Sequence, residues 1–114
     1  MDTKKQFARI AKLKDGWDGD NAPAPSIVAL YNANQIVNLA IENGLTIRDA
    51  DADVIGGIGI WIKSHSSKQK EVWVSCLNGG QRSAVLIQDE HMVHSFKYDD
   101  ETSMSQILRF LTNQ

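Results

Sequence analysis

The chain has 114 residues, a length that accommodates one hydrophobic core and therefore a single domain spanning residues 1–114. Apolar residues make up 42% of it, which is an ordinary globular content and argues against disorder. Twelve basic and 14 acidic residues give a formal net charge of −2. No bulk positive field therefore favours direct binding of nucleic acid or of an anionic membrane.

Cys76 is the only cysteine, which excludes an intrachain disulfide and a multi-cysteine metal site. No window approaches the run of about 18 apolar residues that a membrane span needs, and no apolar run follows the amino terminus as in a secretory signal. We therefore expect a cytoplasmic protein.

Helical spacing of apolar residues predicts two helices in the amino-terminal half. The first covers about residues 4–14, behind Thr3 and Gln6 at the spacing of a capping box. A turn-forming loop follows, and a second helix begins at Pro25 or Ser26 and ends before Gly44. One stripe of this helix should face a sheet, and it consists of Ile27, Leu30, Tyr31, Asn34, Val37 and Ile41.

From Asp53 onward the apolar period changes from 3.6 to 2, which indicates strands. Strands are expected over 57–63, 71–76, 83–88 and 91–97, with turns over 64–69, 78–80 and 89–90. Connections this short require antiparallel pairing. A closing helix follows, with Ser103 and Gln106 again at capping-box spacing.

The predicted fold is α+β: two amino-terminal helices, a four-stranded antiparallel β-meander and a carboxy-terminal helix in two layers. The second and last helices should cover one face of the sheet. The other face then meets water or a partner.

Trp61 and Trp73 alternate with the isoleucine and valine row, so they should lie together on the face that the second helix leaves open. A paired aromatic patch there would be a binding surface. Alternatively Trp17 and the first helix fold over this face and bury both rings, the commoner fate of tryptophans in small domains. We expect Trp17 itself to serve as a structural plug that pins its loop onto the core.

Asp49, Asp51 and Asp53 match the first, third and fifth positions of an EF-hand loop. The match ends there, because Val54 and Ile60 replace the required glycine and glutamate. An acidic solvated loop without metal is therefore expected at these positions.

Three further groups of residues are assigned structural roles. Asp18 and Asp20 should form turns and accept hydrogen bonds from nearby backbone amides. His91 and His94 are three apart on a strand and point to opposite faces, so they should be edge or surface histidines and share no metal. Cys76 is in phase with the core, and the glycines at 56–59 suit a bulge or a close backbone approach.

The segment from Leu13 to Ser26, with its Gly-Trp-Asp-Gly centre and Ala-Pro-Ala-Pro-Ser tail, precedes a helix and then the run Val54-Ile55-Gly56-Gly57-Ile58-Gly59-Ile60-Trp61. This arrangement resembles a family of small, uncharacterised bacterial and phage-borne proteins. The resemblance covers roughly residues 10 to 100. It departs at Asp20-Asn21 and at 51–53, and it implies a fold without implying an activity.

The sequence favours a non-enzymatic protein-binding domain without cofactor or metal, an accessory or inhibitor protein that occludes a partner's surface. The size, mild acidity and phage-like resemblance suit an anti-CRISPR-like inhibitor of a bacterial defence complex, whose acidic loops mimic phosphate. The candidate partner-binding residues are Trp61, Trp73, Asp18, Asp20, Asp49, Asp51 and Asp53.

Two other hypotheses stay open. One is a small metal-dependent hydrolase that uses Asp18, Asp20, Asp51 and Asp53. The other is a homodimer that closes through the open sheet face or through the edge from Asp89 to Lys97.

Overall fold

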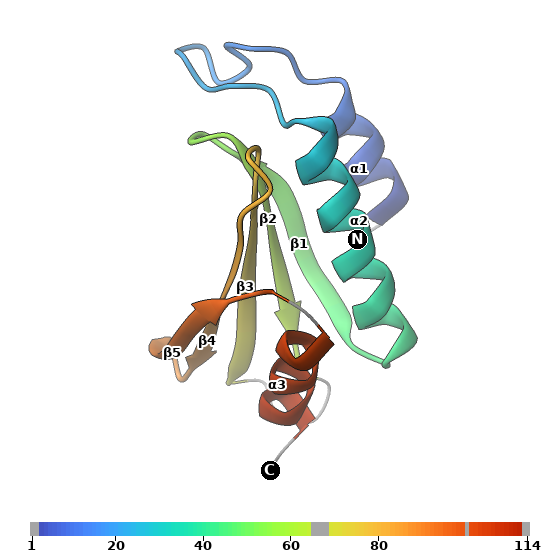
Figure 1. The fold of residues 1–114 in the computed structure, drawn as a ribbon, viewed down its shortest axis with the longest axis vertical. Helices are drawn as coiled ribbons and strands as arrows, with labels where there is room; N and C mark the ends of the chain where they lie inside the picture. Colours follow the sequence, from blue (N-terminus) through green and yellow to red (C-terminus); the bar gives the residue numbers. More distant parts are fainter. Residues whose placement is uncertain (1–2, 65–68, 100, 113–114) are drawn as a thin grey trace.

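A computed structural model describes residues 3–64, 69–99 and 101–112 (Figure 1). The helices of this part are α1 (Thr3–Ala11), α2 (Ile27–Glu42) and α3 (Glu101–Thr112). Its strands are β1 (Thr46–Asp53), β2 (Gly57–Lys63), β3 (Lys70–Leu77), β4 (Arg82–Gln88) and β5 (His91–Lys97). None of the three helices has the length and apolar character that crossing a membrane requires. Residues 65–68 of the expected turn over 64–69 lie outside the described residues.

The sheet of the described residues has five antiparallel strands in the order β1-β2-β3-β4-β5, so the prediction of four strands is wrong. The additional strand, β1, occupies the segment that the sequence assigned to an acidic loop. Its inward residues Ala50 and Ala52 are too small to make a strong apolar pattern, and its register shifts between Ile47 and Asp49. Such a bulge breaks the alternation that identifies a strand.

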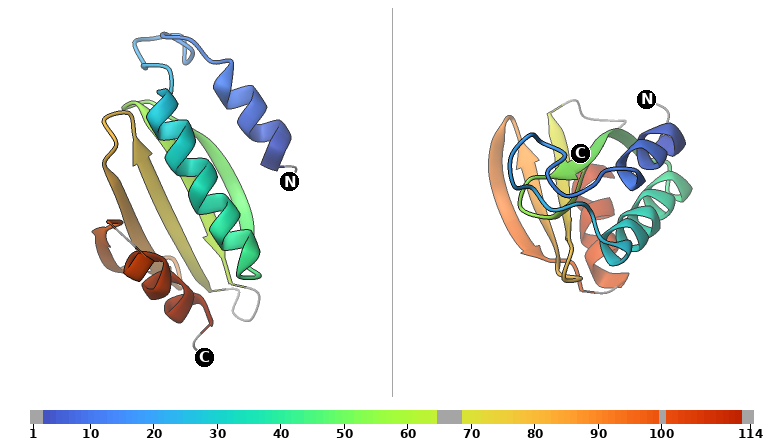
Figure 2. Two further views of the ribbon diagram at one scale, coloured as in Figure 1. Left: turned by 45° about the vertical axis from the view of Figure 1, so that its right-hand side comes forward. Right: turned by 90° about the horizontal axis from the view of Figure 1, so that it is seen from above.

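α2 and α3 lie on one side of the sheet, and α1 lies beside α2 next to the β1 edge (Figure 2). The core fills the space between the two layers. Its centre is a set of fully buried side chains on β2 and β3: Ile58, Ile60, Ile62, Val72, Val74 and Cys76. The expectation that the second and last helices cover one sheet face is therefore confirmed, and among the described residues no helix covers the other face.

α2 is rotated relative to the prediction. Its buried side consists of Ala29, Ala33, Ile36, Val37 and Ala40. Four of the six members of the expected stripe are exposed instead: Asn34, and the large side chains of Ile27 (85%), Tyr31 (57%) and Ile41 (54%). Small alanines let a helix backbone approach a sheet closely, and this packing outweighs the size of the apolar side chains. The outward stripe thus lacks a covering element in the described structure.

Asn78, in the β3–β4 turn, joins this turn to the β1–β2 turn and to the segment before α2, all at one end of the sheet (Figure 1). Its side-chain Oδ1 accepts from the backbone N–H of Ser26 at 2.7 Å, and its Nδ2 donates to the carbonyl of Ala24 at 2.9 Å. Its own backbone N–H donates to the carbonyl of Gly56 at 3.0 Å. Ser26 in turn caps α2 by accepting from the backbone N–H of Ala29. The start of α2 is therefore fixed to two turns of the sheet.

The Asn78→Ala variant should lose about 2 kcal/mol of unfolding free energy, because it leaves a part-buried amide and a carbonyl without their partner. Urea denaturation measures this loss. Asn21→Ala, an exposed position on the loop before α2, is the matched control and should change the value little. Equal values for the two variants would show that Asn78 does not hold the segments together.

Candidate functional site

The open side of the sheet carries an aromatic pair. Trp61 on β2 stands opposite Trp73 on β3, and their ring centroids are 4.6 Å apart at an interplanar angle of 50°. Along the same row of the register lie Asp49 on β1, Val85 on β4 and Ser95 on β5. We call this side of the sheet, with these five residues as its central row, the aromatic face.

α1 and the Trp17 loop do not cover the aromatic face. α1 packs against β1 from the side of α2. The loop lies beyond the end of the sheet that is next to the start of α2 (Figure 2). The alternative in which Trp17 and the first helix bury the two rings is therefore wrong. Trp61 and Trp73 are half-buried by their own strands and neighbours.

A missing side chain positions Trp73. A Cβ atom added to Gly59 would lie 1.8 Å from the Trp73 ring, so the ring rests directly on the backbone of β2. Glycine inside a strand commonly marks such a close approach. The sequence offered this signal, because Gly59 interrupts an otherwise apolar strand, but nothing in it identified the ring as the partner.

Arg48 holds the other ring. Its guanidinium carbon lies 5.2 Å from the Trp61 ring centroid, and its Nη1 donates to both carboxylate oxygens of Glu71, at 2.8 and 3.0 Å. The arginine thus spans from β1 across β2 to β3 over the face of the indole. A cation over a tryptophan at a partly exposed site contributes about 0.5–1 kcal/mol. Sequence reasoning missed Arg48 and Glu71, because only the β1 register brings them together.

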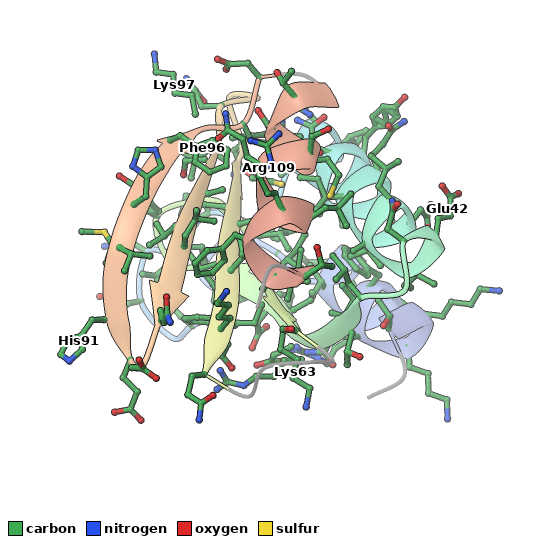
Figure 3. All side chains as sticks on the ribbon, turned by 90° about the horizontal axis from the view of Figure 1, so that it is seen from below. Glu42, Lys63, His91, Phe96, Lys97 and Arg109 are labelled. Atoms are coloured by element: carbon green, nitrogen blue, oxygen red, sulfur yellow. The ribbon has the colours of Figure 1, made fainter. Side chains whose placement is uncertain are left out.

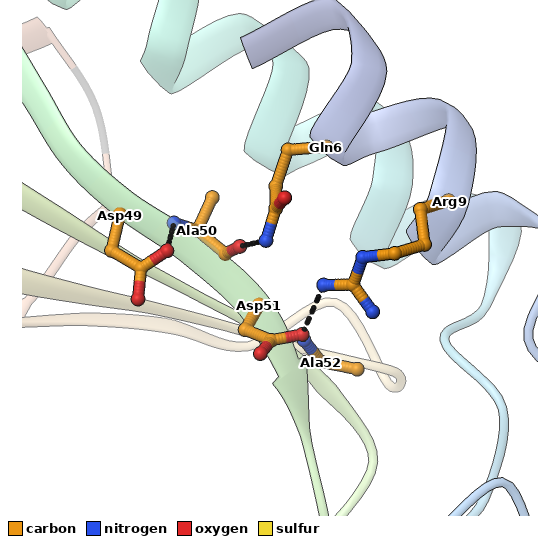
Figure 4. A network of polar contacts seen from close by, with 6 residues as sticks. All are labelled: Gln6, Arg9, Asp49, Ala50, Asp51 and Ala52. Carbon is orange, nitrogen blue, oxygen red and sulfur yellow. Dashed lines mark hydrogen bonds and ion pairs between the residues drawn. The ribbon is translucent and has the colours of Figure 1, made fainter. Parts of the chain in front are cut away.

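The candidate acidic residues on β1 are engaged locally. Asp49 accepts from the backbone N–H of Ala50, and Asp51 accepts from that of Ala52 and from Nη2 of Arg9 at 2.9 Å (Figure 4). Asp53 likewise accepts from the N–H of Ile55. These carboxylates form an acidic border of the aromatic face along β1.

Asp18 and Asp20 are not part of this border and lie in the loop between α1 and α2. Oδ1 of Asp18 accepts from the N–H groups of Asp20 and Ala22, which confirms its role as a turn former. Trp17 is half-buried, and its indole N–H donates to the carbonyl of Pro23 at 3.0 Å. Trp17 therefore closes its own loop but is absent from the apolar core cluster, so the expectation that it pins the loop onto the core is wrong.

A hollow of about 400 Å³ lies at the lower end of the aromatic face. Its walls come from β1, β3, β4 and the β4–β5 turn. Three of its six lining residues are acidic, and the full set is Arg48, Gln69, Glu71, Ile87, Asp89 and Glu90. The hollow could accept a basic side chain that reaches past the aromatic pair.

No group of three or more His, Cys, Asp or Glu side chains that could hold a metal ion occurs among residues 3–64, 69–99 and 101–112. Both histidines of β5, His91 and His94, are exposed on this edge strand, as expected. Cys76 is fully buried, as expected, and burial raises the pKa of its thiol to about 11.

None of the comparisons, with protein-family models, curated proteins and solved structures, finds a match to this chain.

The Gly59→Ala variant should displace the Trp73 ring, because the new methyl group occupies the position of the ring. The near-ultraviolet circular dichroism of the Trp61 and Trp73 pair should then decrease, with a loss of about 1–3 kcal/mol of unfolding free energy. Gly79→Ala is the control, since its methyl group would meet only the flexible side chain of Gln81. An unchanged near-ultraviolet spectrum in Gly59→Ala would contradict the packing.

Because the pKa of Cys76 is raised in the folded state, the free energy of unfolding depends on pH in the alkaline range. The folded state keeps the thiol protonated up to about pH 11, whereas the unfolded chain loses the proton above its ordinary pKa of 9.0. The free energy of unfolding should therefore be unaffected by this group below about pH 9 and fall as the pH rises from about 9 to about 11. Cys76→Ala should remove this part of the pH profile in urea titrations, and an identical profile would contradict the assignment.

Proposed function

We propose that this protein is a non-enzymatic protein-binding domain and that the aromatic face is its binding surface. The observation that supports the proposal is the Trp61 and Trp73 pair on a sheet side that the helices of the described structure leave uncovered. Tryptophan and arginine dominate the energetics of protein interfaces. Here Arg48 and Trp61 are stacked before any partner arrives, so little side-chain entropy remains to be lost on binding.

The charges around the aromatic face indicate the kind of partner. Asp49 and Asp53 border it along β1 together with Asp51, whose charge is paired with Arg9, and Asp89 and Glu90 border it at the β4–β5 turn. Beyond Asp49, the central row consists of the two tryptophans, Val85 and Ser95, none of which is charged. A complementary surface has an apolar centre and a basic rim, which also speeds association.

The hollow beside the β4–β5 turn indicates which side chain of the partner would bind there. An arginine or lysine of the partner can enter it beside Asp89 and Glu90, with its aliphatic stem against Ile87. Glu71 is already paired with Arg48, so the two turn residues supply the remaining negative charge.

A basic surface of this kind is typical of a protein that handles nucleic acid. We propose that the domain acts as an inhibitor by occupying such a surface and that nucleic acid competes with it for the partner. Membership of the small bacterial and phage-borne family is part of the same proposal. An inhibitor of a bacterial defence complex is the most specific form of it.

Affinity capture from a bacterial lysate tests the proposal, with quantitative mass spectrometry as the readout. Val85→Glu places a charge beside Trp73 in the central row without altering the tryptophans, and it should reduce capture of the partner at least about tenfold. Asp89→Asn with Glu90→Gln should weaken capture less and make it less sensitive to salt.

The matched control is Gln106→Glu, which adds the same charge at an exposed position of α3 on the other side of the sheet. It should leave the captured partners unchanged. Far-ultraviolet circular dichroism and thermal melting establish that every variant is folded. Identical partner lists for wild type and Val85→Glu would overturn the aromatic face as the binding surface.

A further inference from the structure

The outward side of α2 is a second uncovered surface. Ile27, Tyr31 and Ile41 are more than half exposed along it. From Ile27 to Ile41 the helix contains no Asp, Glu, Lys or Arg. The solvent-facing side of a surface helix ordinarily carries charged residues, as α1 does with Lys4, Lys5 and Arg9. Charged residues are depleted instead at the centres of protein interfaces, where tyrosine is enriched.

The polar groups on this side are neutral amides. Asn34, Gln35 and Asn38 can each donate and accept hydrogen bonds, so they can pair with identical groups. The Tyr31 hydroxyl accepts from Nε2 of Gln35 at 2.7 Å, which holds the ring over the helix. A hollow of about 340 Å³ lies next to it, lined by Tyr31, Asn34, Gln35, Asn38, Leu39 and Glu42. One helix thus presents both an exposed ring and, beside it, an amide-lined socket.

We propose that the outward side of α2 binds a second copy of this chain, with the two α2 helices packed antiparallel about a two-fold axis. The helix has 16 residues and is about 24 Å long. An axis between Asn34 and Gln35 places Tyr31 of one copy opposite Asn38 of the other, in the socket, and both Gln35 side chains close to the axis. A two-fold interface needs a surface that complements itself, and this one combines ring, socket and amides.

The one charge of α2 selects the antiparallel arrangement. Glu42 is the only charged residue of the helix and points away from the molecule at its carboxyl end (Figure 3). In the antiparallel pair each Glu42 lies near the amino end of the other helix, where the helix dipole stabilises a carboxylate. A parallel pair would bring the two carboxylates together. Between Ile27 and Ile41 the outward side has no charged residue with which a charged partner of another kind could pair.

This dimer is independent of the proposed function. α2 and the aromatic face lie on opposite sides of the sheet (Figure 2). A dimer through α2 therefore leaves both aromatic faces accessible and makes the protein bivalent, which strengthens binding to a partner that presents two sites.

Sedimentation velocity of the full chain over about 10 μM to about 1 mM tests the inference, because one helix face buries less than the roughly 1,000 Å² of a stable interface and should give a weak dimer. The mass should rise with concentration from 12.7 kDa toward twice that value. Gln35→Glu should raise the dissociation constant at least about tenfold, since it places two carboxylates at the axis.

A mixture of the Gln35→Glu and Gln35→Lys variants tests directly whether the two Gln35 side chains meet at the axis. Each variant alone should be monomeric, and the mixture should recover the dimer through opposite charges at the axis. A helix-neutral change at an exposed residue leaves folding intact. Monomers at every concentration would overturn the inference. A second result would also overturn it: the wild type dimerises, Gln35→Glu leaves the dimer unchanged, and Val93→Lys on the β5 edge or Val85→Glu on the aromatic face disrupts it.

Discussion

The contact between Gly59 and Trp73 is the constraint on which the proposed binding surface depends. With no side chain on β2 at this point, the Trp73 indole ring lies on the strand backbone, and its centroid is 4.6 Å from that of the tilted Trp61 ring. Arg48 then covers the second ring and ties it to Glu71. Three strands therefore hold one aromatic pair in a fixed geometry, and a surface organised in advance loses little entropy on binding.

Periodicity predicted most of this architecture. The alternation of Ile58, Ile60 and Ile62 placed Trp61 on the opposite side of the sheet, because side chains of a strand alternate. Strand β1 escaped prediction, since two of its inward residues, Ala50 and Ala52, are small and its bulge separates them from Ile47. The covering of Trp61 by Arg48 was equally inaccessible, because it depends on which residues that bulge places opposite β2.

The buried side of α2 also differs from the predicted one. An apolar stripe containing Ile27 and Tyr31 predicted the wrong buried side, because the alanines on the other side allow the helix to approach the sheet more closely. Size and hydrophobicity alone did not distinguish a core stripe from an interface stripe. The domain consequently has two uncovered surfaces of different character: an aromatic one with an acidic border, and a neutral one on α2.

Footprinting by hydroxyl radicals tests the central claim most directly, because it reports the solvent exposure of each aromatic side chain in one experiment. On addition of a captured partner, the account predicts strong protection of Trp61 and Trp73 with unchanged oxidation of Trp17 and Tyr31. Unchanged oxidation of the two sheet tryptophans, together with protection elsewhere on the domain, would contradict it.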